Sequence, residues 1–180
     1  MAMPHMAPEQ RWKLLATMPE LRRIEIMMAE FVELAGVSED ERQTRLHAMI
    51  LAESDLSEDR LFDMTKARLR AWTRMDQRAA HTVAQSYYPV LQTMGAGIQE
   101  RFKSVEERVF DSLPWEQKRL SLRFIPNDEG YVPDLVESIE PVDEAEVPGG
   151  NAASREEMEE RVLTSWERFR AWVTALTRAA

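Results

Sequence analysis

The sequence SEDRLFDMTKARLRAWTRMDQRAAHTVAQSYY, residues 57–88, carries apolar side chains at steps of mostly three and four along its whole length. Such spacing is typical of one face of an α-helix. We therefore predict one long central helix, roughly 46 Å long if it runs unbroken from 58 to 88. It should end or kink at Tyr88 and Pro89, because proline lacks an amide proton and disfavours a helical conformation in the preceding residue. The apolar positions are Leu61, Met64, Leu69, Trp72, Met75, Ala79, Val83 and Tyr87.

Basic side chains recur at every fourth position of the same stretch, at Lys66, Arg70, Arg74 and Arg78. On a continuous helix, residues at this spacing are neighbours on one face. The pattern predicts a positive ridge, and these four residues are our candidate site for binding a partner or an anion. The same pattern is also typical of a solvated helix face or of one paired with the protein's own acids.

Acidic residues are concentrated elsewhere in the chain. Residues 124–160 contain twelve Asp or Glu and one Arg, a net charge of −11, whereas the rest of the chain has a net charge of +2. This separation indicates a charge-driven contact, either within the molecule or with a partner. The overall charge of −9 argues against non-specific nucleic-acid binding by the molecule as a whole.

Several other stretches have helical start signals. Four positions combine a capping residue with a glutamate three residues later, which is the spacing of a capping box. They are Thr17, Ser38, Asp55 and Ser154. Apolar stripes at helical spacing follow over residues 21–35, 46–50, 98–113 and 158–176. We predict an all-α bundle of about five to six helices.

The pattern changes near residue 120. Leu120 to Phe124 alternates with period two, residues 126–130 favour a turn, and Tyr131 and Val132 follow. This indicates a small β-hairpin near 119–132. The predicted organisation is a disordered tail at 1–7, a helical core at 8–140, an acidic Pro/Gly linker at 141–153, and a C-terminal helix at 154–180 that packs on the core.

The sequence contains no catalytic signature. It has no cysteine, its three histidines are well separated, and it lacks the Glu-x-x-His pairs of dimetal bundles, the Gly-x-Ser-x-Gly elbow and the phosphate loop. We therefore predict no catalytic residues, no metal site and no cofactor. The absence of signal-peptide features and of a run of ~18 apolar residues favours a cytoplasmic protein that is not in a membrane.

Three functional hypotheses follow. The first is a non-enzymatic helical interaction or regulatory protein of adaptor type, which binds a protein partner through the basic ridge, the acidic segment, or both. Another is an enzyme or small-ligand binder that uses an apolar pocket between helices. A homodimer through the apolar face of residues 158–176 is a further hypothesis, although a single bundle helix explains that face equally well.

The second hypothesis is a DNA-linked or ligand-sensing regulator. The segment Val32-Glu-Leu-Ala-Gly-Val-Ser38 resembles the turn of the helix-turn-helix found in many bacterial repressors. In that family the start of the following helix points into the major groove. Here that helix would open with Glu39, Asp40 and Glu41, whose carboxylates would face DNA phosphates unfavourably.

Overall fold

The computed structural model describes residues 7–126, and residues 1–6 and 127–180 lie outside the described part. Within the described residues the chain forms seven α-helices, one short 3₁₀-helix and no strand, which confirms the prediction of an all-α fold. The helices are α1 (Pro8–Leu15), α2 (Glu20–Gly36), α3 (Glu39–Ser54), α4 (Glu58–Trp72), α5 (Gln77–Gln92), α6 (Ala96–Ser112), α7 (Trp115–Ser121) and the 3₁₀-helix η1 (Leu122–Phe124).

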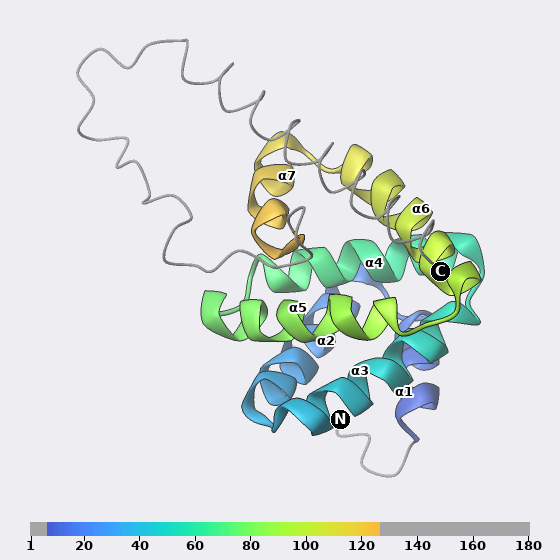
Figure 1. Cartoon of the computed structure of the whole chain (residues 1–180). Coiled ribbons are helices and arrows are strands. Elements are labelled where there is room, and N and C mark those ends of the chain that lie inside the picture. The colour runs from blue at the N-terminus through green and yellow to red at the C-terminus, as the bar shows by residue number, and fades with distance from the viewer. Residues whose placement is uncertain (1–6, 127–180) are drawn as a thin grey trace, which may run out of the picture.

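Helices α4 and α5 cross the middle of the bundle, with α6 and α7 on one side and α1 and α3 on the other (Figure 1). Helix α2 packs on both α4 and α5, α3 packs on α1 and α5, and α6 packs on α4. Trp72, at the end of α4, lies near the centre of the apolar core. Its ring centroid is 5.9 Å from that of Phe31, 5.6 Å from that of Tyr87 and 6.0 Å from that of Phe124. Aromatic rings at these distances stabilise a core beyond their buried area.

The predicted long central helix is wrong, because the chain breaks between Trp72 and Gln77 into α4 and α5. Asp76 caps the start of α5. Its backbone is extended rather than helical, and its Oδ1 atom accepts a hydrogen bond of 3.1 Å from the amide of Ala79. Aspartate is among the best N-capping residues, so it starts a new helix inside an apolar pattern that continues on both sides.

The helix was predicted to end or kink at Tyr88 and Pro89, and it does not end there, since α5 continues to Gln92. Pro89 is exposed and lies in the last turn, and the residues that follow it, Val90 and Leu91, are buried. A proline near the end of a helix removes one backbone hydrogen bond. Burial of two apolar side chains offsets that loss, because each contributes roughly 1.5–3 kcal/mol.

The first strand of the predicted hairpin is helical. Residues from Leu120 to Phe124 belong to the end of α7 and to η1, and the only side chains of this stretch that are fully buried are Ser121 and Phe124. Their separation of three residues suits a tight helix, and the contact between Phe124 and Trp72 fixes it. The predicted second strand, the linker at 141–153 and the C-terminal helix at 154–180 lie outside the described residues. So does the predicted N-terminal tail, except for Ala7.

One of the predicted capping boxes marks a helix start. Ser38 caps α3, where its Oγ atom accepts a hydrogen bond of 3.4 Å from the amide of Glu41. Thr17 instead donates to the carbonyl of Leu14, and Pro19 precedes α2. Asp55 ends α3, and Ser57 precedes α4. The fourth box, at Ser154, lies outside the described residues.

Candidate functional site

The four residues of the predicted ridge do not form a row on one helix. Lys66 and Arg70 lie on α4, Arg74 lies in the connection to α5, and Arg78 lies in the first turn of α5. Arg70 is already engaged, because its guanidinium forms an ion pair with Glu20 of α2 and its Nε donates to Gln117 Oε1 at 3.4 Å. The single positive ridge predicted from the spacing is therefore wrong, because the chain leaves α4 before Arg74 and enters α5 before Arg78.

Helix α7 and the 3₁₀-helix η1 both contact the end of α4, and η1 contains a further basic residue, Arg123. Arg70 contacts Gln117 of α7, and Trp72 contacts Phe124 of η1, the neighbour of Arg123 in the chain. We call this group the basic corner, defined as Lys66, Arg70, Arg74, Arg78 and Arg123.

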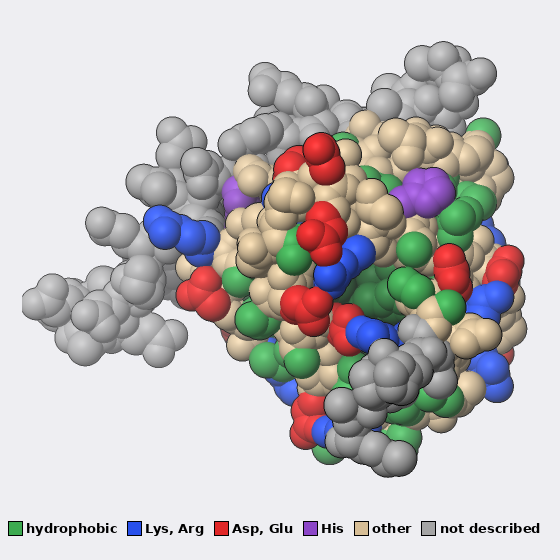
Figure 2. Space-filling model, turned by 90° about the horizontal axis from the view of Figure 1, so that it is seen from below, with side chains coloured by type: hydrophobic (Ala, Val, Ile, Leu, Met, Phe, Trp, Pro, Cys, Tyr) green, Lys and Arg blue, Asp and Glu red, His purple; other side chains and the backbone are tan. Residues whose placement is uncertain are grey.

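Most other arginines in the described part of the chain are paired with carboxylates. Examples are Arg11 with Glu30 at 2.5 Å and Arg45 with Glu33 at 2.5 Å. On the face seen from below in Figure 2, acidic and basic side chains are correspondingly interspersed.

By contrast, four members of the basic corner, all except Arg70, form no ion pair with any residue that the structure describes. Arg74 and Arg78 are also exposed. Arg60, Arg101 and Lys118 also form no ion pair with a described residue, but they lie outside this group.

A second concentration of charge lies inside the bundle. Arg68 of α4 is 0% exposed and binds two carboxylates. Its Nη1 lies 2.8 Å from Glu53 Oε2 of α3, and its Nη2 lies 3.2 Å from Glu106 Oε1 of α6. Nη2 also lies 3.4 Å from the hydroxyl of Thr65. We call Glu53, Arg68 and Glu106 the buried ionic cluster, which joins three helices.

Aromatic residues surround this cluster and isolate it from water. The guanidinium carbon of Arg68 lies 4.4 Å from the ring centroid of Tyr87 and 6.0 Å from that of Trp72, both within the range of cation–π attraction. Burial raises the pKa of Glu106 to about 7, with Arg68 opposing the rise. Burial raises the pKa of Glu53 as well, and that of Tyr87 well above its ordinary value.

Several polar atoms of the buried ionic cluster and its aromatic neighbours have no hydrogen-bond partner within residues 7–126. They are Glu53 Oε1, Arg68 Nε, Trp72 Nε1 and the hydroxyl of Tyr87. Buried polar atoms are nearly always paired in folded proteins, so several unpaired atoms in one place mark a region of unusual polarity. The cluster can hold charge and protons, but its members have almost no exposed surface on which a substrate could bind.

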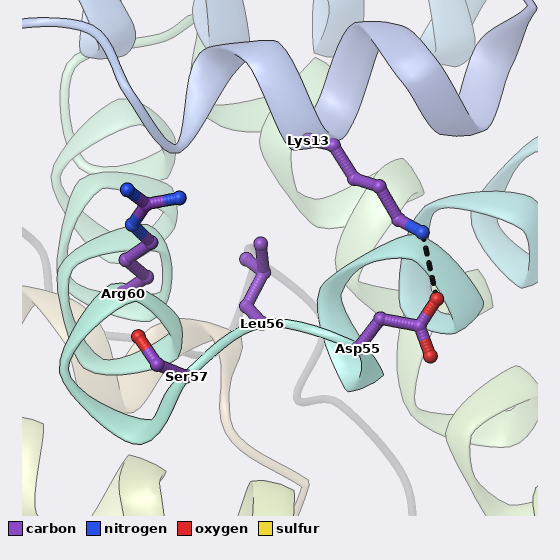
Figure 3. A pocket seen from close by; sticks show the side chains of 5 residues that line it. All are labelled: Lys13, Asp55, Leu56, Ser57 and Arg60. Atoms are coloured by element: carbon purple, nitrogen blue, oxygen red, sulfur yellow. Dashed lines mark hydrogen bonds and ion pairs between the residues drawn. The ribbon is translucent and has the colours of Figure 1, made fainter.

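A surface pocket of about 430 Å³ lies near the start of α4, away from the basic corner. It is lined by Lys13, Asp55, Leu56, Ser57 and Arg60. Figure 3 shows Leu56 between two sets of polar groups: Arg60 and Ser57 on one side, and Lys13 joined to Asp55 at 2.7 Å on the other. Lys13, Asp55, Ser57 and Arg60 are exposed, and none of the five is a strong nucleophile.

The start of α3 bears on the helix-turn-helix hypothesis. Glu39 pairs with Arg42 and accepts a hydrogen bond of 3.0 Å from Ser86, and Glu41 pairs with Arg45 at 2.6 Å. These carboxylates form the acidic first turn of the helix that would enter a DNA groove. Binding of nucleic acid by this element stays a hypothesis.

No group of three or more histidine, aspartate or glutamate side chains among the described residues is arranged to hold a metal ion. None of the helices that the structure describes has the length and apolar character needed to cross a bilayer.

Sequence reasoning missed the buried ionic cluster. The available signal was position: Arg68 lies three residues after Thr65 and one before Leu69, on the side of α4 that the apolar pattern assigns to the core. A charged residue in that register predicts a buried partner of opposite sign. The identity of the partners could not be read from spacing, because Glu53 and Glu106 lie on other helices.

Comparison with protein-family models, with curated proteins and with solved structures finds no match for the chain.

Proposed function

We propose that this protein is a non-enzymatic helical interaction protein that binds an acidic segment of a protein partner through the basic corner. The observation that carries the proposal is the placement of Arg74 and Arg78. Both are exposed and without a carboxylate partner among the described residues, in a chain where most other described arginines are paired.

Physical chemistry favours an acidic partner at such a corner. Arginine binds carboxylates through two parallel hydrogen bonds and so combines charge with geometric selectivity. Clustered charge of one sign also accelerates association with a partner of opposite charge. Because Arg74 and Arg78 are exposed, each ion pair that they form contributes only ~0–1 kcal/mol, so binding should weaken as salt concentration rises.

The acidic segment of residues 124–160 belongs to the same proposal. Its net charge of −11 makes it either a second contact for a partner or a competitor for the basic corner. Competition would set a threshold, so that only a partner with a denser array of carboxylates displaces the chain's own acids.

Fluorescence anisotropy with a labelled peptide of alternating Glu and Ser tests the proposal on the full chain. We expect the double variant Arg74→Glu and Arg78→Glu to bind the peptide about tenfold more weakly, a change of about 1.4 kcal/mol. The matched control is Arg22→Glu with Arg60→Glu, which changes the net charge equally at two exposed positions outside the corner. Equal losses in the two double variants would show a general charge effect and reject a specific corner.

The same assay separates the alternatives. Duplex DNA in place of the peptide, bound by the wild type and lost on reversal of Arg74 and Arg78, would favour the DNA-linked regulator instead. No binding of either probe at low salt would remove the basic corner from the function.

A further inference from the structure

The buried ionic cluster contains an imbalance of charge. It has two carboxylates, from Glu53 and Glu106, and one guanidinium, from Arg68. Glu53 and Arg68 are 0% exposed and Glu106 is 6% exposed, so water compensates little of their charge. The cluster spans α3, α4 and α6, so its charge state affects how three helices pack.

Within residues 7–126, Arg68 is the cation that pairs with Glu53 and Glu106. Besides Glu53 and Arg68, the titratable groups that face Glu106 are Tyr87 and Tyr88 of α5. Burial raises the pKa of both tyrosines well above their ordinary value, so both stay neutral near pH 7 and provide no positive charge. An arginine stays protonated at all pH values where a protein is folded and offers one positive charge only.

Electroneutrality therefore requires a proton. With both carboxylates ionised, one negative charge would remain uncompensated in the protein interior, which is strongly unfavourable. With one proton shared between Glu53 and Glu106, the cluster is neutral. We infer that the buried ionic cluster is a proton-binding site whose occupancy controls how firmly α6 is held against α4.

The packing of α6 explains why this helix should respond. Helix α6 packs mainly on α4, and Glu106 provides its buried polar contact with that helix. Two further contacts of α6 lie toward the surface: Arg101 donates to the carbonyls of Ser54 and Leu56, and Arg108 pairs with Glu58. Loss of the proton puts a second full negative charge at the inner contact, while the outer ones are unchanged.

The direction of the effect follows from linkage. The pKa of Glu106 is about 7 in the folded protein against an ordinary value of 4.5, so the folded state keeps its proton over a range where the unfolded chain loses it. The stabilisation that protonated Glu106 contributes is fully present below about pH 4.5. It decreases between about pH 4.5 and pH 7 and is lost above that range. Within that window the folding equilibrium constant should fall about tenfold per pH unit. This inference does not depend on the proposed function.

Urea unfolding of the full chain between pH 5 and 8 tests the proton site, with Glu106→Gln as the variant and Glu100→Gln as control. Glu100 is exposed on the same helix. We expect the stability of the wild type and of the control to fall steeply as pH rises toward 7. In Glu106→Gln this tenfold fall of the folding equilibrium constant per pH unit should be missing. An equal slope in all three proteins would overturn the inference.

A second measurement holds even if Glu106→Gln fails to fold. Carbon-13 NMR of glutamate side-chain carboxyls in the wild-type protein should show one carboxyl that titrates near pH 7. Titration of every glutamate near the ordinary value would overturn the proton site.

Hydrogen exchange, corrected for the intrinsic effect of pH, should show greater opening of α6 relative to α2 above pH 7. Parallel behaviour of the two helices would reject the control of α6.

Discussion

Helix α4 and the connection after it place two arginines in opposite environments a few residues apart. Arg68 is fully buried, contacts two carboxylates and lies against aromatic rings, whereas Arg74 is exposed and has no carboxylate partner among the described residues. The difference shows that residue type alone does not assign a role. Arg68 lies on the buried side of α4, whereas Arg74 lies in the connection that follows the helix.

The two regions should also differ in how strongly they affect stability. Removal of one partner from a buried ionic group leaves an uncompensated charge and costs about 3–5 kcal/mol. An exposed charge away from such features changes stability by less than about 0.5 kcal/mol. Measurements of the free energy of unfolding therefore test whether the buried ionic cluster and the basic corner differ in their effect on stability.

The largest effect is expected from Arg68→Ala. This change leaves Glu53 and Glu106 buried together without a cation, and we expect the free energy of unfolding to fall by about 3–5 kcal/mol. Urea denaturation followed by tryptophan fluorescence measures it. A loss below about 1 kcal/mol would mean that the cluster is no more important to stability than an exposed ion pair.

A triple variant separates charge from volume. Replacing Arg68 by Met, Glu53 by Leu and Glu106 by Leu removes all three charges while retaining much of the buried volume. We expect the triple variant to recover at least the wild-type stability, because apolar replacements of buried ionic groups are often neutral or stabilising by about 1–4 kcal/mol. If it is as unstable as Arg68→Ala, the loss comes from packing rather than from unpaired charge.

An intermediate effect is expected at the junction between the two regions. Asp76 caps α5 through the amide of Ala79 at 3.1 Å, and so it fixes the break that separates Arg74 from Arg78. We expect Asp76→Ala to lower the free energy of unfolding by about 1 kcal/mol and Asp76→Asn to restore most of it, because asparagine caps equally well. Thermal unfolding of both variants is the measurement, and equal instability of the two would argue against the cap.

The sequence predicts the helical class and part of the core, because apolar spacing indicates which face of a helix is buried, as at Phe31 and Val109. It does not show the break after Trp72, since the apolar positions continue in register across it and only the side chain of Asp76 marks the new start. The alternation at Leu120 was misleading for a related reason, because two buried positions three residues apart also suit a short helix. Local patterns specify faces better than boundaries.

The candidate sites show the same difference between what a local pattern indicates and what depends on the tertiary structure. Lys66, Arg70, Arg74 and Arg78 stand out in the sequence, but their spacing implied one helix, and the pairing of Arg70 with Glu20 depends on a contact between helices that are distant in sequence. The buried ionic cluster joins residues from three helices, so only the fold shows which carboxylates meet Arg68. Pairing partners require the tertiary structure.

The most direct test of the central claim is one crossed measurement of stability and peptide binding on Arg68→Lys and on Arg74→Gln with Arg78→Gln. Lysine keeps the charge of Arg68 but cannot bind two carboxylates in the same forked geometry. We expect Arg68→Lys to lose stability while its folded fraction binds the acidic peptide as the wild type does. The double variant should keep its stability within about 0.5 kcal/mol and bind more weakly. If both proteins lose stability and binding together, the division between a buried structural arginine and exposed binding arginines is wrong.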